Sequence, residues 1–478
     1  MSTFRVLAGV GPTLAFENPV EVLRDEAGDP DAALTTAQER LGDGAWIAGY
    51  LGYDGRVALG VFAPPREIEL PASGAAPHSP LLSTVGRDDY EAAIHDLQRS
   101  IYEGDVYQVN YTVPFALETH GDPLALYAHY AHRTGAKYQA YVEDGARAIL
   151  SWSPELFLAL EGTRVETKPM KGTAPPDRVE ELQSEKNRAE HLMIVDLLRN
   201  DLYRVCDRVS VEELFTVERY PTFATMTSTI AGELRTGTSF AQIVRATFPC
   251  GSVTGAPKRA AMQAIARSER TSRGAYCGSI GFLSPQRRGW WNVAIRTAQI
   301  DAATGIGRFD AGGGIVADSK ADEEWEEVRL KARFLDPGDF AILETFASDA
   351  DDAALRAHVS RMRSAARAFG VDFDAPGLIA ALGSHASHDE RRHLIRVRLH
   401  ADGRFEILDE ELERQGEPVP ICIAQARVRS DDPFLRYKTT WRPAQDAAKA
   451  EGRRAGCFDA LMCNERGELT EGWRTNLF

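Results

Sequence analysis

The sequence lacks the two features that would send a protein into or across a membrane. It has no uninterrupted apolar run near the roughly 18 residues that a membrane span requires. Its first residues also lack the charged, apolar and small-residue zones of a secretory signal. Cysteine is scarce, with six residues among 478, no CxxC pair and no histidine at zinc-finger spacing. We therefore expect a cytoplasmic protein with free thiols.

An excess of basic residues is also missing. The 55 lysines and arginines face 70 aspartates and glutamates, which gives a formal net charge of -15. Such a balance argues against a nucleic-acid-binding surface. Hydrophobic residues make up 44% and charged residues 26%, as is typical of a soluble globular protein. A chain of this length exceeds one hydrophobic core, so more than one domain is expected.

The order of strand-like and helix-like segments predicts an α+β fold. Most of the expected strands follow one another directly in the sequence, which favours antiparallel sheets. "WWNVAIRTAQI", residues 290–300, is interpreted as one strand, and residues 184–206 as a largely buried helix. The stretch "LDPGDFA" ends a helical pattern and is interpreted as a linker. It divides the chain into two predicted modules, 1–336 and 338–478.

Acidic residues in two predicted helices are candidate ligands of Mg²⁺. Glu190 lies in the helix predicted for 184–206. Glu324 and Glu327 are spaced i, i+3 in "EEWEE", so both carboxylates can point to one place. Hard cations prefer such oxygen ligands, although a solvated acidic helix face explains the pair equally simply.

Three further features suggest binding of an anion. Three consecutive glycines, Gly312–Gly314, let backbone amides approach an anion closely, but a flexible loop is an equal alternative. Arg296 lies in an apolar run and needs an anionic partner, either a ligand carboxylate or an internal ion pair. Lys171 lies in "VETKPMKGTAPP", where prolines restrict the backbone, and by itself is interpreted as a surface lysine in a turn.

Taken in order, several motifs resemble the chorismate-utilising enzymes. The motifs are "EGDVYQVN", "SWSPELFL", "PMKGT", "AEHLMIVDLLRND", "FPCGSVTGAPKRAAM", "AYCGSIGFLS", "IRTA" and "AGGGIVADS", and they cover roughly residues 85–336. The family includes component I of anthranilate synthase and of aminodeoxychorismate synthase, and the isochorismate and salicylate synthases. The resemblance implies a Mg²⁺-dependent enzyme that binds chorismate, with the anthranilate synthase component I fold of antiparallel sheets flanked by helices.

The resemblance also implies roles for individual residues. Glu190 and Glu327 would bind Mg²⁺, with Glu324 as a more distant or water-mediated contact. Glu155 would protonate the departing C4 hydroxyl. The residues implied to hold the chorismate carboxylates or line the pocket are Thr254, Gly255, Gly278, Arg296, the amides of Gly312, Gly313 and Gly314, and Lys331.

Lys171 falls at the position that carries lysine in the aminodeoxychorismate branch. The resemblance implies that its amine attacks C2, and that ammonia then attacks C4 to give 4-amino-4-deoxychorismate, a step toward 4-aminobenzoate and folate. Since no glutaminase module is visible, ammonia is expected from a separate glutamine amidotransferase subunit. The alternatives are anthranilate synthase component I and, in another class, a non-catalytic scaffold that binds the amidotransferase. Two positions depart from the family pattern: Thr225 replaces a histidine, and Asn187 replaces a glutamate.

Residues 341–478 resemble the N-terminal part of the class IV pyridoxal-phosphate enzymes, in particular aminodeoxychorismate lyase. The resemblance implies that Arg361 grips the cofactor phosphate, that Lys438 bonds to the cofactor and that Glu471 pairs with the pyridinium nitrogen. The sequence ends at Phe478, the last residue of "TNLF". We therefore expect a truncated lyase-like module, either a fragment of a longer fusion or a degenerate half with incomplete or vestigial lyase activity.

Overall fold

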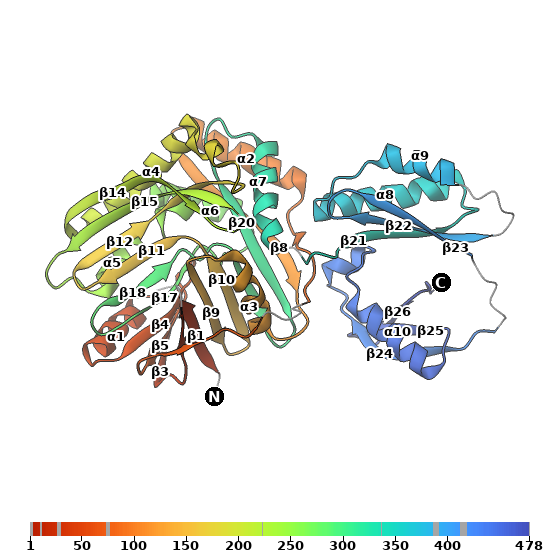
Figure 1. Cartoon of the computed structure of the whole chain (residues 1–478), viewed down its shortest axis with the longest axis horizontal. Helices are drawn as coiled ribbons and strands as arrows, with labels where there is room; N and C mark the ends of the chain where they lie inside the picture. Colours follow the sequence, from red (N-terminus) through yellow and green to blue (C-terminus); the bar gives the residue numbers. More distant parts are fainter. Residues whose placement is uncertain are drawn as a thin grey trace. The chain divides into compact units, whose positions relative to one another are not determined.

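The computed structural model forms two compact units, Met1–Leu335 and Asp336–Phe478 (Figure 1). It describes residues 3–9, 12–25, 30–72, 77–221, 223–335, 337–385, 392–411 and 418–477. Residue 336, where the first predicted module ends, lies outside this described part. Within it, no helix is both long enough and apolar enough to cross a membrane.

Two large sheets form the first unit, and all their strand pairs are antiparallel. In order, the first sheet contains β16 (Gly255–Ala256), β8 (Gln108–Glu118), β20 (Ile306–Ile315), β19 (Thr297–Asp301), β10 (Arg147–Ser153), β9 (Tyr138–Asp144), β1 (Phe4–Gly9), β2 (Thr13–Phe16) and β6 (Arg66–Ile68), and β7 (Leu82–Ser83) also pairs with β8.

The order in the second sheet is β13 (Met170–Ala174), β15 (Ala224–Leu234), β12 (Arg164–Lys168), β11 (Leu156–Glu161), β18 (Arg288–Asn292), β17 (Ser279–Leu283), β4 (Trp46–Leu51), β5 (Val57–Phe62) and β3 (Glu21–Asp25). A further strand, β14 (Cys206–Arg219), pairs with β15. The two sheets pack against each other through apolar side chains such as Phe16, Phe62 and Ile149.

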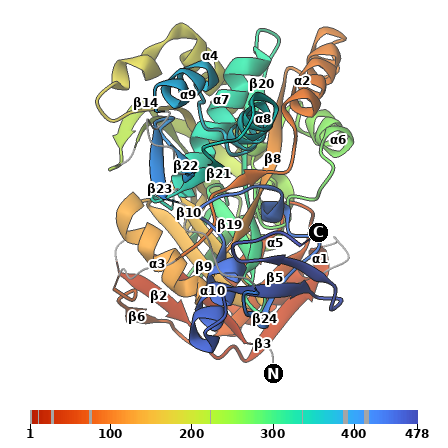
Figure 2. The ribbon, with the colours of Figure 1, turned by 90° about the vertical axis from the view of Figure 1, so that its right-hand side faces the viewer.

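Helices cover the outer faces of this sandwich. The second sheet packs on α1 (Asp31–Gly42), α4 (Glu185–Tyr203) and α5 (Phe240–Thr247). The first packs on α2 (Arg87–Tyr102), α3 (Pro123–Thr134), α6 (Lys258–Ser268) and α7 (Ala321–Ala332). Both views place α2, α4, α6 and α7 at the end of the unit away from the N-terminus (Figure 2). Short 3₁₀ turns occur at Val179–Gln183, Gly251–Val253 and Arg333–Leu335.

The α+β class and the antiparallel sheets are confirmed, but three local predictions are wrong. Residues 290–300 are not one strand, because β18 belongs to the second sheet and β19 to the first. The helix α4 is not largely buried: Ile194 and Leu198 are buried, whereas Leu192 is half exposed. Gly312–Gly314 do not form a loop, since they lie in β20 opposite residues 110–112 of β8.

The second unit contains two three-stranded sheets. The first consists of β21 (Ala341–Ala347), β22 (His393–His400) and β23 (Phe405–Glu411), covered by α8 (Asp352–Phe369) and α9 (Ala375–His385). The second consists of β24 (Ile421–Val428), β25 (Asp459–Asn464) and β26 (Leu469–Gly472), packed on α10 (Pro443–Ala455), and a 3₁₀ turn lies at Pro433–Arg436. Strands β24 and β25 are parallel, because α10 connects them, and depart from the antiparallel expectation.

Candidate active site

The chain crosses between the two sheets of the first unit at Glu155 and again at Arg296. Glu155 lies between β10 and β11, and Arg296 lies between β18 and β19. A backbone hydrogen bond joins the two crossings, from Val293 N to Glu155 O at 3.0 Å. Ser153 adds a second link by donating from Oγ to Val293 O at 2.6 Å. The topology of the sandwich therefore places the two crossings side by side.

The Glu155 side chain is almost completely buried, with 2% of its surface exposed. Burial raises its pKa to about 7, although hydrogen bonds from the Ser252 hydroxyl and the Met170 amide and the charge of Lys171 lower it. Oε1 has no hydrogen-bond partner among the described residues. A carboxyl group in this state holds a proton near neutral pH, as a general acid must.

Lys171 projects from a bulged strand rather than from a surface turn. It lies opposite Met226 in the β13–β15 ladder, and the register shifts directly after it. Gly172 supplies the turn with a φ of 76°, which a residue with a side chain rarely adopts. Thr225 donates from Oγ1 to Gly172 O at 2.7 Å and so fixes the bulge. The threonine that replaces the family histidine thus holds the backbone next to Lys171.

The Lys171 amine reaches across to the other sheet. Its Nζ lies 2.9 Å from Glu190 Oε2 on α4, and both side chains are only about a fifth exposed. It would also lie 2.9 Å from a Cβ placed on Gly314 of β20. A Cβ there would also lie 2.2 Å from Gln108 Nε2, so a side chain at residue 314 would displace both Gln108 and the amine. Asn187, the other predicted departure from the family pattern, donates from Nδ2 to Glu181 O at 2.9 Å, and its amide lies 3.9 Å from a Cβ placed on Gly172.

The carboxylates of Glu324 and Glu327 gather over the neighbouring glycine. A Cβ on Gly313 would lie 3.3 Å from Glu324 Oε2 and 3.9 Å from Glu327 Oε1. Burial is the main cause that raises the pKa of Glu324, and the negative charge of Glu327 adds to it. Lys331 pairs with Glu327 Oε1 at 2.7 Å and donates to Gly312 O, also at 2.7 Å.

These carboxylates have the chemistry of a magnesium site, but they are not yet arranged as one. Among the described residues, no three His, Cys, Asp or Glu side chains are close enough together to hold a metal ion. Instead, Lys171 neutralises Glu190 and Lys331 neutralises Glu327. The oxygen donors of these glutamates fit Mg²⁺, which binds through one or two carboxylates and keeps its other positions for water and substrate.

Arg296 has no acidic partner among the described residues, so the predicted alternative of an internal ion pair is wrong. Its guanidinium lies 3.9 Å from the ring centre of Phe223 and 5.3 Å from that of Phe334. Burial lowers its pKa to about 10. Its φ of 49° holds it in a bend, outside any strand. A desolvated cation of this kind favours an anionic ligand.

Replacing Arg296 by methionine should therefore have opposite effects on stability and binding. We expect a higher midpoint of thermal unfolding, because a buried unpaired charge is removed. The KM for a dicarboxylate substrate should rise by about 10- to 100-fold, because a charged hydrogen-bond donor is lost. Thermal scans and steady-state kinetics measure the two effects, and a lower midpoint with an unchanged KM would contradict this assignment.

Thr254, Gly255 and Gly278 make contacts with the backbone of neighbouring segments. Thr254 Oγ1 donates to the carbonyls of Cys250 and Gly251 at 3.2 Å, so its hydroxyl is used inside its own turn. Gly255 pairs with Val109 of β8, where a Cβ would collide with the neighbouring carbonyl. Gly278 O accepts from Ala294 N at 2.9 Å, beside the crossing that carries Arg296. All three therefore shape the walls around the charged residues.

Two buried polar residues near Lys171 were missed by the sequence reasoning. Gln108 is 1% exposed, approaches the same side of Gly314 as Lys171, and its Oε1 has no partner among the described residues. His191 lies 2.7 Å through Nε2 from Ser228 Oγ, and burial together with the charge of Lys171 lowers its pKa to about 4. Both lie within quoted motifs, but only the fold shows which way they point.

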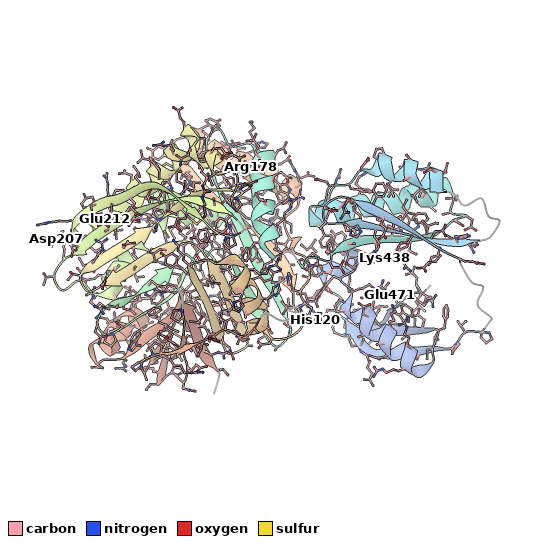
Figure 3. All side chains as sticks on the ribbon, in the orientation of Figure 1. His120, Arg178, Asp207, Glu212, Lys438 and Glu471 are labelled. Atoms are coloured by element: carbon pink, nitrogen blue, oxygen red, sulfur yellow. The ribbon has the colours of Figure 1, made fainter. Side chains whose placement is uncertain are left out.

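The three residues predicted for a cofactor in the second unit lie in different settings. Arg361 on α8 donates to both oxygens of Glu344 at 3.0 Å. Lys438 lies beside the β21–β22–β23 sheet (Figure 3), and its backbone carbonyl accepts from Leu343 N at 2.7 Å. Burial lowers its pKa, the negative charge of Glu344 opposes this shift, and repulsion from Arg442, Arg396 and Arg361 adds to it. Glu471 on β26 accepts from Gln445 Nε2 at 3.2 Å.

Arg442, Arg396 and Arg361 place positive charge near Lys438, which is compatible with a phosphate group, although Arg361 is paired with Glu344. A lowered pKa favours the neutral amine that would bond to a cofactor. Glu471 is exposed and contacts Gln445.

Comparison with known proteins identifies both units. A family model described as chorismate binding enzyme matches residues 56–337, more than half of the chain. The chain belongs to the chorismate-binding enzymes. A second model, amino-transferase class IV, matches residues 344–478. The chain thus joins a chorismate-binding domain to a class IV aminotransferase-like module.

Curated relatives align with about half of this chain and about half of their own length. Component 1 of anthranilate synthase from Aquifex aeolicus is 38% identical over 264 residues, 53% of each chain. Component 1 of aminodeoxychorismate synthase from Escherichia coli is 39% identical over 256 residues, 51% of this chain and 56% of that one. The aligned identities are nearly equal, so overall similarity does not choose between the two branches.

Solved structures share the fold. A putative isochorismate synthase from Bacillus anthracis matches with a TM-score of 0.62 and 22% identity, covering 70% of this chain and 94% of that chain. Anthranilate synthase component I from Streptococcus pneumoniae matches with a TM-score of 0.59 and 24% identity, covering 69% and 91%. The chorismate-binding enzymes therefore share this helix-covered sandwich.

Proposed function

We propose that the first unit converts chorismate and ammonia into 4-amino-4-deoxychorismate. The observation that carries this proposal is the position of Lys171. Its amine lies within 2.9 Å of Glu190, and its charge acts on the buried Glu155. A nucleophile and a general acid thus share one site, as the substitution of a ring hydroxyl requires.

The proposed reaction proceeds in two displacements. Glu155 donates its proton to the C4 oxygen, which leaves as water, while the Lys171 amine forms a bond to C2. Ammonia then forms a bond to C4, the bond from Lys171 to C2 breaks, and the ring double bonds return to their original positions. The Lys171 amine attacks in its neutral form, because only that form has a free electron pair.

Glu190, Glu324 and Glu327 would hold Mg²⁺, and Arg296 would bind a substrate carboxylate. The metal would supply positive charge that offsets the repulsion between these glutamates and a dicarboxylate substrate. Ammonia would come from a glutamine amidotransferase subunit, or from ammonium in its absence. The anthranilate synthase relatives make that enzyme the second candidate, and a lysine positioned to attack C2 favours the aminodeoxychorismate branch.

Incubation with chorismate, Mg²⁺ and ammonium tests the proposal. The expected product is non-fluorescent and is converted to 4-aminobenzoate when a separate aminodeoxychorismate lyase is added. Anthranilate fluorescence in the absence of the lyase would support the second candidate instead. No turnover in the presence of the amidotransferase would support a scaffold role.

Removing one metal-binding carboxylate should weaken Mg²⁺ binding without disturbing the fold. We expect Glu327→Gln to raise the Kd for Mg²⁺ by about tenfold or more, because a charged oxygen ligand becomes neutral. Glu326→Gln is the matched control, since Glu326 is exposed and pairs with Arg329. Calorimetric titration measures both variants, and equal Kd values would contradict the assignment.

We further propose that the second unit binds pyridoxal phosphate through Lys438, with Arg361 near the phosphate. The cofactor would supply an electron-withdrawing ring, and the chain would hold and orient it. Borohydride reduction after mixing should attach the cofactor to Lys438 and to no residue in Lys438→Ala. Lys449, which contacts Trp473, is the matched control for non-specific labelling. Lyase activity, which would release pyruvate, is proposed only for a module that retains the cofactor.

A further inference from the structure

Two of the six cysteines differ from the other four in exposure. Cys206, Cys250 and Cys277 in the first unit are at most 2% exposed, and Cys463 in the second is 8% exposed. Cys422 and Cys457 are partly exposed and free. Thiol reagents reach exposed sulfur atoms first, so reactivity should be confined to this pair.

The fold brings Cys422 and Cys457 together although they are far apart in the sequence. Strands β24 and β25 pair in parallel, with Ile421 opposite Asp459. Just before this ladder, Phe458 N donates to Pro420 O at 2.7 Å. The Cys422 thiol donates to Asp459 O at 3.7 Å, two residues after Cys457, and the Cys457 thiol is close enough to influence the pKa of Cys422. The two side chains therefore meet at the solvent-exposed start of the ladder.

The surroundings give the two thiols different roles. The hydrogen bond with Cys457 is the main cause that raises the pKa of Cys422 to about 11, and the carboxylates of Glu451 and Asp459 act in the same direction. The Cys422 thiolate is thus disfavoured, and its thiol donates to Asp459 O at 3.7 Å. The Cys457 thiol donates to Ala455 O at 3.9 Å, at the turn that follows α10, and is assigned the first attack.

We propose that Cys422 and Cys457 form a dithiol site that exchanges with low-molecular-weight disulfides to give an internal disulfide. Cys457 attacks one sulfur of the reagent, forms a mixed disulfide and releases one thiol. Cys422 then loses its proton and attacks the Cys457 sulfur, which releases the second thiol. One disulfide bond is consumed, one is formed, and two reagent thiols are produced.

The disulfide would close the segment 422–457 into a loop. That segment contains Lys438 and the whole of α10. A covalent link limits the conformations open to the chain between its ends. Oxidation would therefore restrict the part of the second unit that carries Lys438, without touching the first unit.

Treatment of the full chain with oxidised glutathione tests this site. We expect the two accessible thiols to disappear, the intact mass to fall by about 2 Da, and proteolysis to yield a peptide pair linked through Cys422 and Cys457. The variants Cys422→Ser and Cys457→Ser are matched controls, because each leaves one partner. Cys422→Ser should keep one glutathione, since the second thiol is missing.

Other outcomes would overturn the proposal. Wild-type chain that carries one or two glutathiones would show that the sulfurs do not reach each other. A disulfide-linked dimer would also overturn the proposal, and so would two accessible thiols that remain unchanged. None of these readouts depends on chorismate turnover, so the outcome is independent of the proposed function.

Discussion

Replacing Lys171 by alanine should reduce formation of 4-amino-4-deoxychorismate by about a thousandfold or more, because the attacking group is lost. Any residual turnover should lead toward anthranilate, since ammonia can then reach C2. Chromatography of the products with and without added lyase measures both effects. The binding of chorismate should change much less than kcat, because Arg296 still holds a carboxylate.

Lys168 provides the matched control for this substitution. It lies three residues earlier and pairs with Glu218 Oε1 at 2.7 Å rather than with Glu190. Lys168→Ala should therefore keep the wild-type product at a similar rate. Equal losses in both variants would show that any lysine removed from this edge disturbs the sheet. Wild-type product at near wild-type rate from Lys171→Ala would refute the covalent role.

Glu155→Gln should lower kcat by about 100- to 10,000-fold, because the departing hydroxyl loses its proton donor. In the wild type, kcat/KM should fall as the pH rises through about 7, the pKa to which burial raises this carboxyl. The reaction needs the protonated carboxyl group of Glu155, and ionisation at higher pH removes this form. A pH profile of kcat/KM for chorismate measures this limb, and a rate that is constant between pH 6 and 8 would contradict the assignment.

The same substitution should stabilise the folded chain at high pH. Between the unfolded value of 4.5 and the folded value of about 7, the folded state holds a proton that the unfolded state has lost. Stability therefore falls as the pH rises through this window, by about 3 kcal/mol in total. Glu155→Gln should recover this amount at pH 8 and little of it at pH 4.5. Denaturant unfolding at the two pH values measures the difference.

Much of the first unit could be predicted from the sequence because its local patterns agree with its fold. Alternating strands, an amphipathic α2 and ordered motifs pointed to antiparallel sheets and helices. The crossing at Arg296 could not be predicted, because residues 290–300 have the pattern of one continuous strand. Only the pairing of β18 and β19 with different sheets divides it.

For the candidate site, too, part could be predicted from the sequence and part could not. The sequence supplied Lys171, Glu155 and Glu190 through motifs, but not their contacts. It left open an ion pair for Arg296 that the aromatic rings of Phe223 and Phe334 replace. It assigned Gly314 an amide that approaches an anion, but it did not show that Gln108 and a lysine from the opposite sheet lie against this residue. Contacts between distant segments are set by packing, which a pattern along one segment does not record.

The most direct measurement is the intact mass of the protein after mixing with chorismate and Mg²⁺ while ammonia is withheld. We expect an adduct of about 208 Da, the mass of chorismate less water, on Lys171. Addition of ammonium should release it. It should be absent from Lys171→Ala and present in Lys168→Ala. Production of 4-amino-4-deoxychorismate by a chain that never forms this adduct, or that forms it on Lys331, would contradict the account.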